Sequence, residues 1–114
     1  MLSNNIYIVG LMGSGKTSIG KLLSKSLDSE HVDIDQEIVK KTNLTISEIF
    51  ENHGENHFRE LESNMLNNVS KRKNLIVSTG GGVILSSENI STMQNTGSII
   101  PVSYTHLRAH ETYP

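Results

Sequence analysis

Residues 10 to 17 read Gly10-Leu11-Met12-Gly13-Ser14-Gly15-Lys16-Thr17 and match the pattern G-x-x-x-x-G-K-[ST] in full. The apolar, β-branched run from Ile6 to Val9 precedes this loop and is typical of a buried strand. After the loop, apolar residues recur at helical spacing, at Ile19, Leu22, Leu23 and Leu27. The sequence therefore predicts a strand, a glycine-rich turn and a helix, an arrangement that binds phosphate groups.

Each part of this loop suits phosphate chemistry. Glycines allow successive backbone N–H groups to converge on phosphate oxygens without interference from a Cβ. The Lys16 ammonium can reach the β- and γ-phosphates of a nucleotide, and the Thr17 hydroxyl can bind Mg²⁺. We therefore expect ATP and Mg²⁺ as cofactors, with Lys16 in a catalytic role. A plain glycine-rich turn ahead of a helix is the alternative, and it accounts poorly for the full match.

Strands and helices alternate along the rest of the chain. Thr45-Ile46-Ser47-Glu48 has the spacing of a capping box, and Gly54 can close the short helix that it opens. Such alternation predicts a three-layer α/β/α fold with a parallel sheet and helices on both faces. The expected strands lie near residues 31–34 and 75–77 and from residue 98, and the expected helices near 35–41, 46–50, 58–69 and 89–94.

Composition narrows the class of protein. The 114 residues suit one domain, and the net charge of −2 with interspersed signs argues against a nucleic-acid or membrane surface as the main partner. The chain has no cysteine, and no apolar run is long enough for a membrane span. His31, His53 and His57 form no metal set, because Gly54 interrupts the helical spacing of the last two. We expect a cytoplasmic monomer that binds small molecules.

The second predicted strand ends in Val32-Asp33-Ile34-Asp35. Alternation along a strand would place the Asp33 and Asp35 side chains on the same side, at the edge where open α/β sheets bind ligands. One carboxylate could hold Mg²⁺ through water, and the other could orient an attacking hydroxyl. The alternative is that Asp35 caps the next helix and Asp33 is solvated.

Two further features point to the same edge of the sheet. Arg59, beside Phe58 on a predicted helix, suits bidentate binding of a carboxylate or phosphate, and Glu62 at i+3 could hold its guanidinium in place. An exposed ion pair of little consequence is the alternative. Gly80-Gly81-Gly82 directly follow the third strand and allow a ligand to approach the backbone closely, although a flexible turn would also contain glycine.

Together these motifs resemble the shikimate kinases, a family of P-loop small-molecule kinases. The resemblance runs from about Ile6 to Ile100. It rests on the phosphate loop, on Val32-Asp33-Ile34-Asp35, on Ile49-Phe50, Gly54-Glu55 and Phe58-Arg59, and on Thr79-Gly80-Gly81-Gly82 in this order. It implies a kinase that uses ATP and Mg²⁺ to phosphorylate a hydroxyl of shikimate, giving shikimate 3-phosphate on the route to the aromatic amino acids.

The resemblance also implies a role for each matching residue. Asp33 would join Thr17 in the Mg²⁺ shell, Asp35 would hold the attacking hydroxyl, and Arg59 would bind the shikimate carboxylate. Phe50 and Phe58 would wall the pocket. The nucleotide would contact Gly13, Ser14, Gly15, Lys16, Thr17 and Ser18, and the acceptor would contact Asp35, Arg59, Gly80, Gly81 and Gly82.

The last residues depart from the pattern. Pro101 is expected to interrupt the fourth strand, and the residues after it show neither alternation nor a helical face. We expect residues 1–100 to be the N-terminal part of a P-loop kinase domain, with a fold that is incomplete at its C-terminus, and residues 101–114 to be a non-native or irregular tail. The family also has a lid arginine and a C-terminal arginine that contacts shikimate. Neither is matched in this sequence, which predicts little or no activity for these 114 residues.

Two alternatives remain open. One is a related kinase for gluconate or another small hydroxy acid. The other is a nucleotide-binding fragment without transfer activity.

Overall fold

The computed structural model describes residues 4–10 and 15–102, with the side chains of residues 15–17 outside the description. The elements in chain order are β1 (Asn5–Gly10), α1 (Gly15–Ser26), β2 (Glu30–Asp33), α2 (Ile34–Thr42), α3 (Ile46–His53), α4 (Glu55–Ser70), β3 (Leu75–Ser78), the 3₁₀ turn η1 (Val83–Leu85), α5 (Ser87–Thr96) and β4 (Gly97–Val102). Every predicted strand and helix is present.

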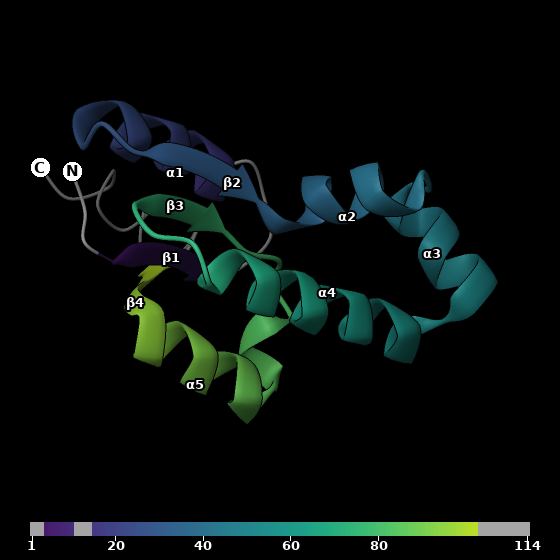
Figure 1. Ribbon diagram of the computed structural model, residues 1–114. Helices are drawn as coiled ribbons and strands as arrows, with labels where there is room; N and C mark the ends of the chain where they lie inside the picture. The colour runs from purple at the N-terminus through teal and green to yellow at the C-terminus, as the bar shows by residue number, and fades with distance from the viewer. Residues whose placement is uncertain (1–3, 11–14, 103–114) are drawn as a thin grey trace, which may run out of the picture.

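The four strands form one parallel sheet in the order β2-β3-β1-β4. Parallel strands are joined by right-handed crossovers, and the chain steps from β1 toward β2 but returns toward β3 and then β4. The connection through α1 therefore covers one face, and the connections through α4 and α5 cover the other (Figure 1). The expected three-layer α/β/α fold is confirmed.

The hydrophobic core lies between the two central strands and their covering helices. β3 is buried along its whole length, as expected for a strand with neighbours on both edges and helices on both faces. Leu66 and Val69 of α4 and Met93 of α5 complete the core on one face. Among the described residues, no helix is both long enough and apolar enough to cross a bilayer.

Helices α2 and α3 and the first half of α4 extend beyond the sheet as an arm (Figure 1). The predicted capping box opens α3, since the Thr45 N–H donates to Glu48 Oε1 at 2.8 Å and the Glu48 N–H donates to Thr45 Oγ1 at 3.1 Å. Gly54, with a φ of 87°, ends α3 and turns the chain into α4. Ile49 and Phe58 then pack inside the arm with Ile38.

The structure corrects two expectations and adds one element. Strand β2 ends at Asp33 and α2 begins at Ile34, so Asp35 lies in the first turn of a helix and does not alternate with Asp33 along a strand. Pro101 does not interrupt the fourth strand. β4 pairs with β1 through Pro101 to Val102, and within the described residues it is an edge strand, where the missing N–H of proline is tolerated. The turn η1 was not predicted.

Candidate functional site

The carboxyl ends of β1, β2 and β3 meet at one edge of the sheet. Asp33 is in register with Ser78, and Ser78 with Ile8, so the segments that follow these three residues start side by side. Thr79 fastens this edge, because both its N–H and its hydroxyl donate to the Ile8 carbonyl, at 3.1 and 2.8 Å. The end of β1, the Asp33–Asp35 segment and the triple glycine therefore converge at this edge.

The phosphate loop itself lies largely outside the described residues. Of its predicted nucleotide contacts, Gly13 and Ser14 are not described, and Gly15, Lys16 and Thr17 are described only as the backbone that begins α1. Ser18 is exposed in the same first turn. The position of the α1 amino terminus, directly after β1 at the binding edge, fits phosphate binding by its free N–H groups. The side-chain roles of these residues stay predictions.

Helix α1 packs very closely on the sheet. A Cβ on Gly20 would lie 2.5 Å from His31 Nε2 and 2.8 Å from Ser78 Oγ, so a larger residue would push the helix away. His31 and Ser78 hydrogen-bond to each other at 2.8 Å across β2 and β3. Burial lowers the pKa of His31, the charge of Asp33 raises it and that of Lys21 lowers it, with burial the largest effect. These contacts hold the phosphate-loop helix against the strands.

Asp33, and not Asp35, caps α2. The Gln36 N–H donates to Asp33 Oδ1 at 3.1 Å. A carboxylate has lone pairs for several bonds, so a carboxylate that caps a helix can also accept from a water of a hydrated cation. Asp33 and Thr17 would supply only hard oxygen ligands, which suit Mg²⁺, an ion that commonly keeps several waters. In the part of the chain that the structure describes, no three acidic, histidine or cysteine side chains are grouped so that they could hold a metal ion.

Arg59 is fixed from two sides on α4. Its Nη1 donates to Glu62 Oε1 at 3.2 Å, and its Nη2 donates to Glu55 Oε2 at 3.3 Å. The guanidinium lies 5.4 Å from the centre of the Phe58 ring, and that ring packs on Phe50 at 4.9 Å. The Arg59 side chain is 33% exposed, so a ligand can still reach it. The expected Arg–Glu pair is present, but Glu62 is buried, so the pair is more than a surface contact.

The triple glycine gives this arginine its space. A Cβ on Gly82 would overlap the Arg59 guanidinium. A Cβ on Gly80 would lie 2.9 Å from Glu62 Oε2 and 3.2 Å from Asp35 Oδ1. The structure therefore brings Asp35, Arg59, Gly80 and Gly82 together, as predicted, and adds Glu62 at the centre of the group. Gly81 lies between them in the chain and is exposed.

Arg59 also borders an open cleft of about 310 Å³ between α4 and the η1–α5 segment. Its polar walls include Ser63 of α4 and Ser86 and Asn89 near the start of α5, none of which the sequence analysis selected. Ser63 lies one helical turn after Arg59, which is the one spacing signal that could have identified it. The cleft is lined by Glu55, Asn56, Arg59, Glu62, Ser63, Gly82, Leu85, Ser86 and Asn89.

The two histidines near Gly54 lie on either side of the break between α3 and α4. Gly54 separates the two helices, as expected, and both histidines are exposed. The bend nevertheless brings the His53 and His57 rings to a centroid distance of 4.8 Å. Spacing along one helix could not reveal this contact, because it depends on the angle between α3 and α4.

Comparisons with known proteins agree with this arrangement. The family model described as shikimate kinase matches residues 12–110. A shikimate kinase of Caldicellulosiruptor bescii is 50% identical over 95 residues, which cover 83% of this chain and 55% of that protein. The chain thus spans little more than half the length of the curated relatives it matches.

Solved structures give the same result. The shikimate kinase of Acinetobacter baumannii in complex with shikimate superposes with a TM-score of 0.86 at 40% identity, covering 96% of this chain and 62% of that one. A gluconokinase from Sinorhizobium meliloti superposes with a TM-score of 0.53 at 17% identity, over 89% of this chain and 57% of that one. The second likeness extends to the fold alone.

Proposed function

The chain belongs to the shikimate kinase family, and on this premise we propose that the full-length protein transfers the γ-phosphoryl group of ATP to a hydroxyl of shikimate, giving shikimate 3-phosphate. The observation that supports this most directly is the cluster of Asp35, Arg59 and Gly80 at the carboxyl edge of the sheet. It offers an acid for a hydroxyl, a cation for a carboxylate and a backbone free of side chains in one place, which are the groups that a hydroxylated acid requires.

Each group would have one role in the transfer. The Arg59 guanidinium binds the acceptor carboxylate, and the Asp35 carboxylate accepts a hydrogen bond from the attacking hydroxyl and takes up its proton. Backbone groups of Gly80, Gly81 and Gly82 contact the ring hydroxyls. Because phosphoryl transfer passes through a loose transition state, orienting the acceptor in this way accounts for much of what the protein contributes.

The nucleotide would lie on the other side of the same edge. Residues from Gly13 to Ser18 surround its phosphates, and Lys16 offsets the charge that develops on the transferred group. Thr17 and Asp33 would hold Mg²⁺, which neutralises charge between the phosphates when it is bound. Monomeric state, a cytoplasmic location and the absence of nucleic-acid and membrane partners belong to the same proposal.

Acceptor specificity tests this function. In a full-length protein that contains these residues, ADP release should depend on shikimate far more than on gluconate, since the arginine and glycine cluster suits a carboxylate on a compact ring. Lys16→Ala and Asp35→Asn should each abolish turnover. A stronger response to gluconate would favour the related-kinase alternative, and ATP binding without any acceptor-dependent turnover would favour a nucleotide-binding protein.

The extent of the kinase unit is a separate proposal. We infer that residues 1–100 are the N-terminal part of the kinase domain and contain the site residues named above, and that residues 101–114 are not part of the native kinase sequence. The resemblance to the family, as read from the sequence, fades at about Ile100, whereas the family-model match continues to residue 110. Sequencing the gene beyond the codon for Ile100 decides between a native continuation and a foreign tail. The 114 residues alone should show little or no kinase activity.

A further inference from the structure

Glu62 has one paired and one unpaired oxygen in the interior of the site. Its side chain is 1% exposed, and Oε1 accepts the hydrogen bond from Arg59 Nη1. Oε2 is also buried, and within the described part of the chain no donor reaches it. An ionised carboxylate in this position is costly, because the second oxygen has lost water without gaining a partner.

The unpaired oxygen faces a second acidic side chain. Glu62 Oε2 and Asp35 Oδ1 both lie within 3.2 Å of the point that a Cβ on Gly80 would occupy, so the two carboxylates border the same small space. Two negative charges at such a position repel each other, whereas one proton held between two carboxyl groups converts the repulsion into a hydrogen bond. The missing side chain of Gly80 leaves room for this contact.

Burial favours a proton on Glu62. Burial raises the pKa of Glu62, the hydrogen bond and charge of Arg59 lower it, and the charge of Asp35 raises it, with burial the largest effect and an upward shift as the net result. Arg59 comes from α4 itself and Asp35 from α2. On the side of η1 and α5, the cleft presents Ser86 and Asn89, which carry no charge.

We propose that Glu62 carries a proton on Oε2 and donates it to the Asp35 carboxylate, so that a neutral Glu62 is a positioning residue that joins Asp35 to Arg59. This inference rests on the proposed function and adds a reason for its specificity. Because Glu62 is neutral, the positive charge of Arg59 remains available to an anionic acceptor. Because the proton is donated to Asp35, that carboxylate is oriented and still carries the negative charge that the attacking hydroxyl needs.

Loss of this proton should weaken acceptor binding. An ionised Glu62 would neutralise Arg59 and would add a second negative charge beside Asp35. The KM for shikimate should therefore rise about tenfold as the pH increases through the raised pKa of Glu62, while kcat changes much less. In Glu62→Gln, the amide oxygen still accepts from Arg59 and the amide N–H still donates to Asp35. The KM of this variant should stay low and nearly independent of pH.

A direct titration makes the proposal independent of catalysis. In the ligand-free wild-type protein, the ¹³C resonance of one glutamate carboxyl should titrate well above the ordinary value of 4.5, and Glu62→Gln should remove that resonance. Glu60→Gln, an exposed change on the same helix, is the matched control and should remove a resonance that titrates normally. If no glutamate titrates high in the wild-type protein, the proposal is wrong, whether or not Glu62→Gln folds.

The pH dependence of KM is a second, independent test of the proton on Glu62. A KM profile of Glu62→Gln that rises with pH in parallel with the wild type would also overturn the proposal. Failure of the proposed function can be recognised separately. A protein that does not phosphorylate shikimate gives no KM for shikimate, but the titration of Glu62 can still be recorded in it.

Discussion

At the scale of single residues, Arg59 combines features that are rarely found together. Its guanidinium stacks on Phe58, pairs with the buried Glu62 and with the exposed Glu55, and still borders an open cleft. These contacts fix the planar group before a ligand arrives, which reduces the entropy lost on binding. A lysine would keep the charge but would lose the forked geometry and the stacking.

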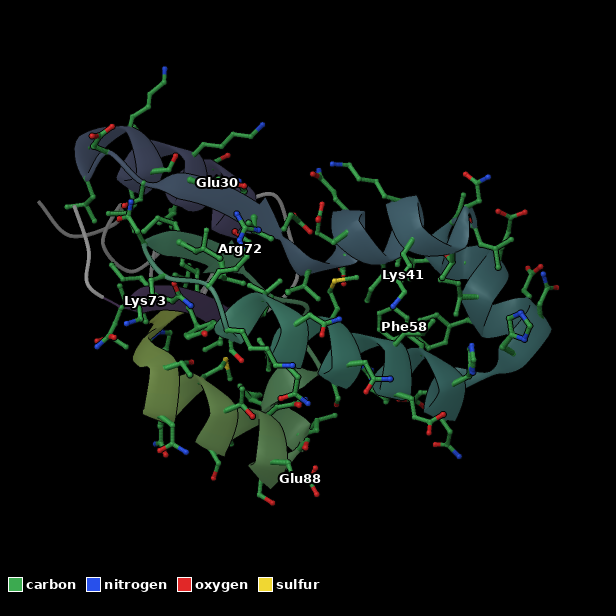
Figure 2. The ribbon with its side chains drawn as sticks, viewed as in Figure 1. Glu30, Lys41, Phe58, Arg72, Lys73 and Glu88 are labelled. Carbon is green, nitrogen blue, oxygen red and sulfur yellow. The ribbon has the colours of Figure 1, made fainter. Side chains whose placement is uncertain are left out.

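Arg59→Lys should therefore raise the KM for shikimate by about 10- to 100-fold, corresponding to the loss of about 1.5–3 kcal/mol from a charge-assisted pair, with a smaller change in kcat. Steady-state kinetics on the full-length protein measures both constants. Arg72→Lys is the matched control, because Arg72 pairs with Glu30 at 2.7 Å beside β2 and β3, away from Phe58 and the arm (Figure 2). An unchanged KM in Arg59→Lys would remove the assignment of the carboxylate to this residue.

A substitution at Gly82 tests the same site, because Gly82 lies against the Arg59 guanidinium. A methyl group at this position would overlap the Arg59 guanidinium, which is the flexible end of a side chain and not backbone. Gly82→Ala should therefore fold with nearly unchanged stability while it displaces the guanidinium and raises the KM for shikimate. Thermal unfolding and kinetics measured together separate the two effects. A large loss of stability without a change in KM would mean that Gly82 serves the fold and not the acceptor site.

At the scale of secondary-structure elements, α3 depends on its first turn. The capping box at Thr45 and Glu48 satisfies two backbone N–H groups that the helix cannot pair internally. The helix has only 8 residues, which is too short to be stable without caps and packing. The cap therefore helps to position Ile49 in the arm and Phe50 against Phe58.

Thr45→Ala should destabilise the protein by about 1 kcal/mol, the usual effect of removing a side-chain cap. Urea unfolding followed by circular dichroism measures the change in free energy. Ser47→Ala, an exposed change inside the same helix, is the control and should change the stability by less than about 0.5 kcal/mol. Equal effects of the two substitutions would show that the cap contributes nothing beyond helix propensity.

The elements were more predictable than the side chains they position. Ile6 to Val9 and Leu75 to Val77 are apolar and β-branched, so local sequence identifies these strands and their burial. Asp35 was assigned to a strand because alternation cannot locate the residue at which a strand becomes a helix, and that boundary depends on the cap made by Asp33. Pro101 was judged as if its strand were central, whereas strand order is a tertiary property.

The residues of the candidate site were also predictable only in part from the sequence. Arg59 and the triple glycine could be selected from residue type and position, because few alternatives explain them. The overlap of Gly82 with Arg59 and the closeness of Gly80 to Glu62 and Asp35 depend on how α4 packs beside the loop after β3. Burial of Glu62 could not be predicted from a helical pattern, in which a glutamate is ordinarily assigned to the solvent face.

At the scale of the whole molecule, the two ends of the sheet differ in how their buried polar groups are paired. At the amino end, Asn5 donates to the Arg72 carbonyl at 2.9 Å and accepts from the Leu75 N–H at 3.0 Å, and the Tyr7 hydroxyl bonds to Thr96 at 2.6 Å. These buried and partly buried bonds join β1 to the turn after α4, to the start of β3 and to the end of α5. The carboxyl end, by contrast, contains a buried acid with an unpaired oxygen.

This arrangement makes the stability of the whole protein depend on the protonation of Glu62. Because burial raises the pKa of Glu62 in the folded state above the ordinary value of 4.5, the folded protein binds this proton more tightly than the unfolded chain does. The stabilisation of the folded state by this proton is complete below pH 4.5 and is lost as the pH rises through the raised pKa of Glu62. Over that window the free energy of unfolding should fall with pH in the wild type.

Glu62→Gln should remove this part of the pH dependence, because the amide does not titrate. Urea unfolding at a series of pH values should give a smaller fall for Glu62→Gln than for the wild type and for the control Glu60→Gln, so that the variant gains relative stability as the pH increases. The comparison between the two Glu→Gln variants cancels the effect of changing the net charge by one unit. Parallel curves for all three proteins would mean that Glu62 is ionised in the folded state, with Arg59 offsetting its burial completely.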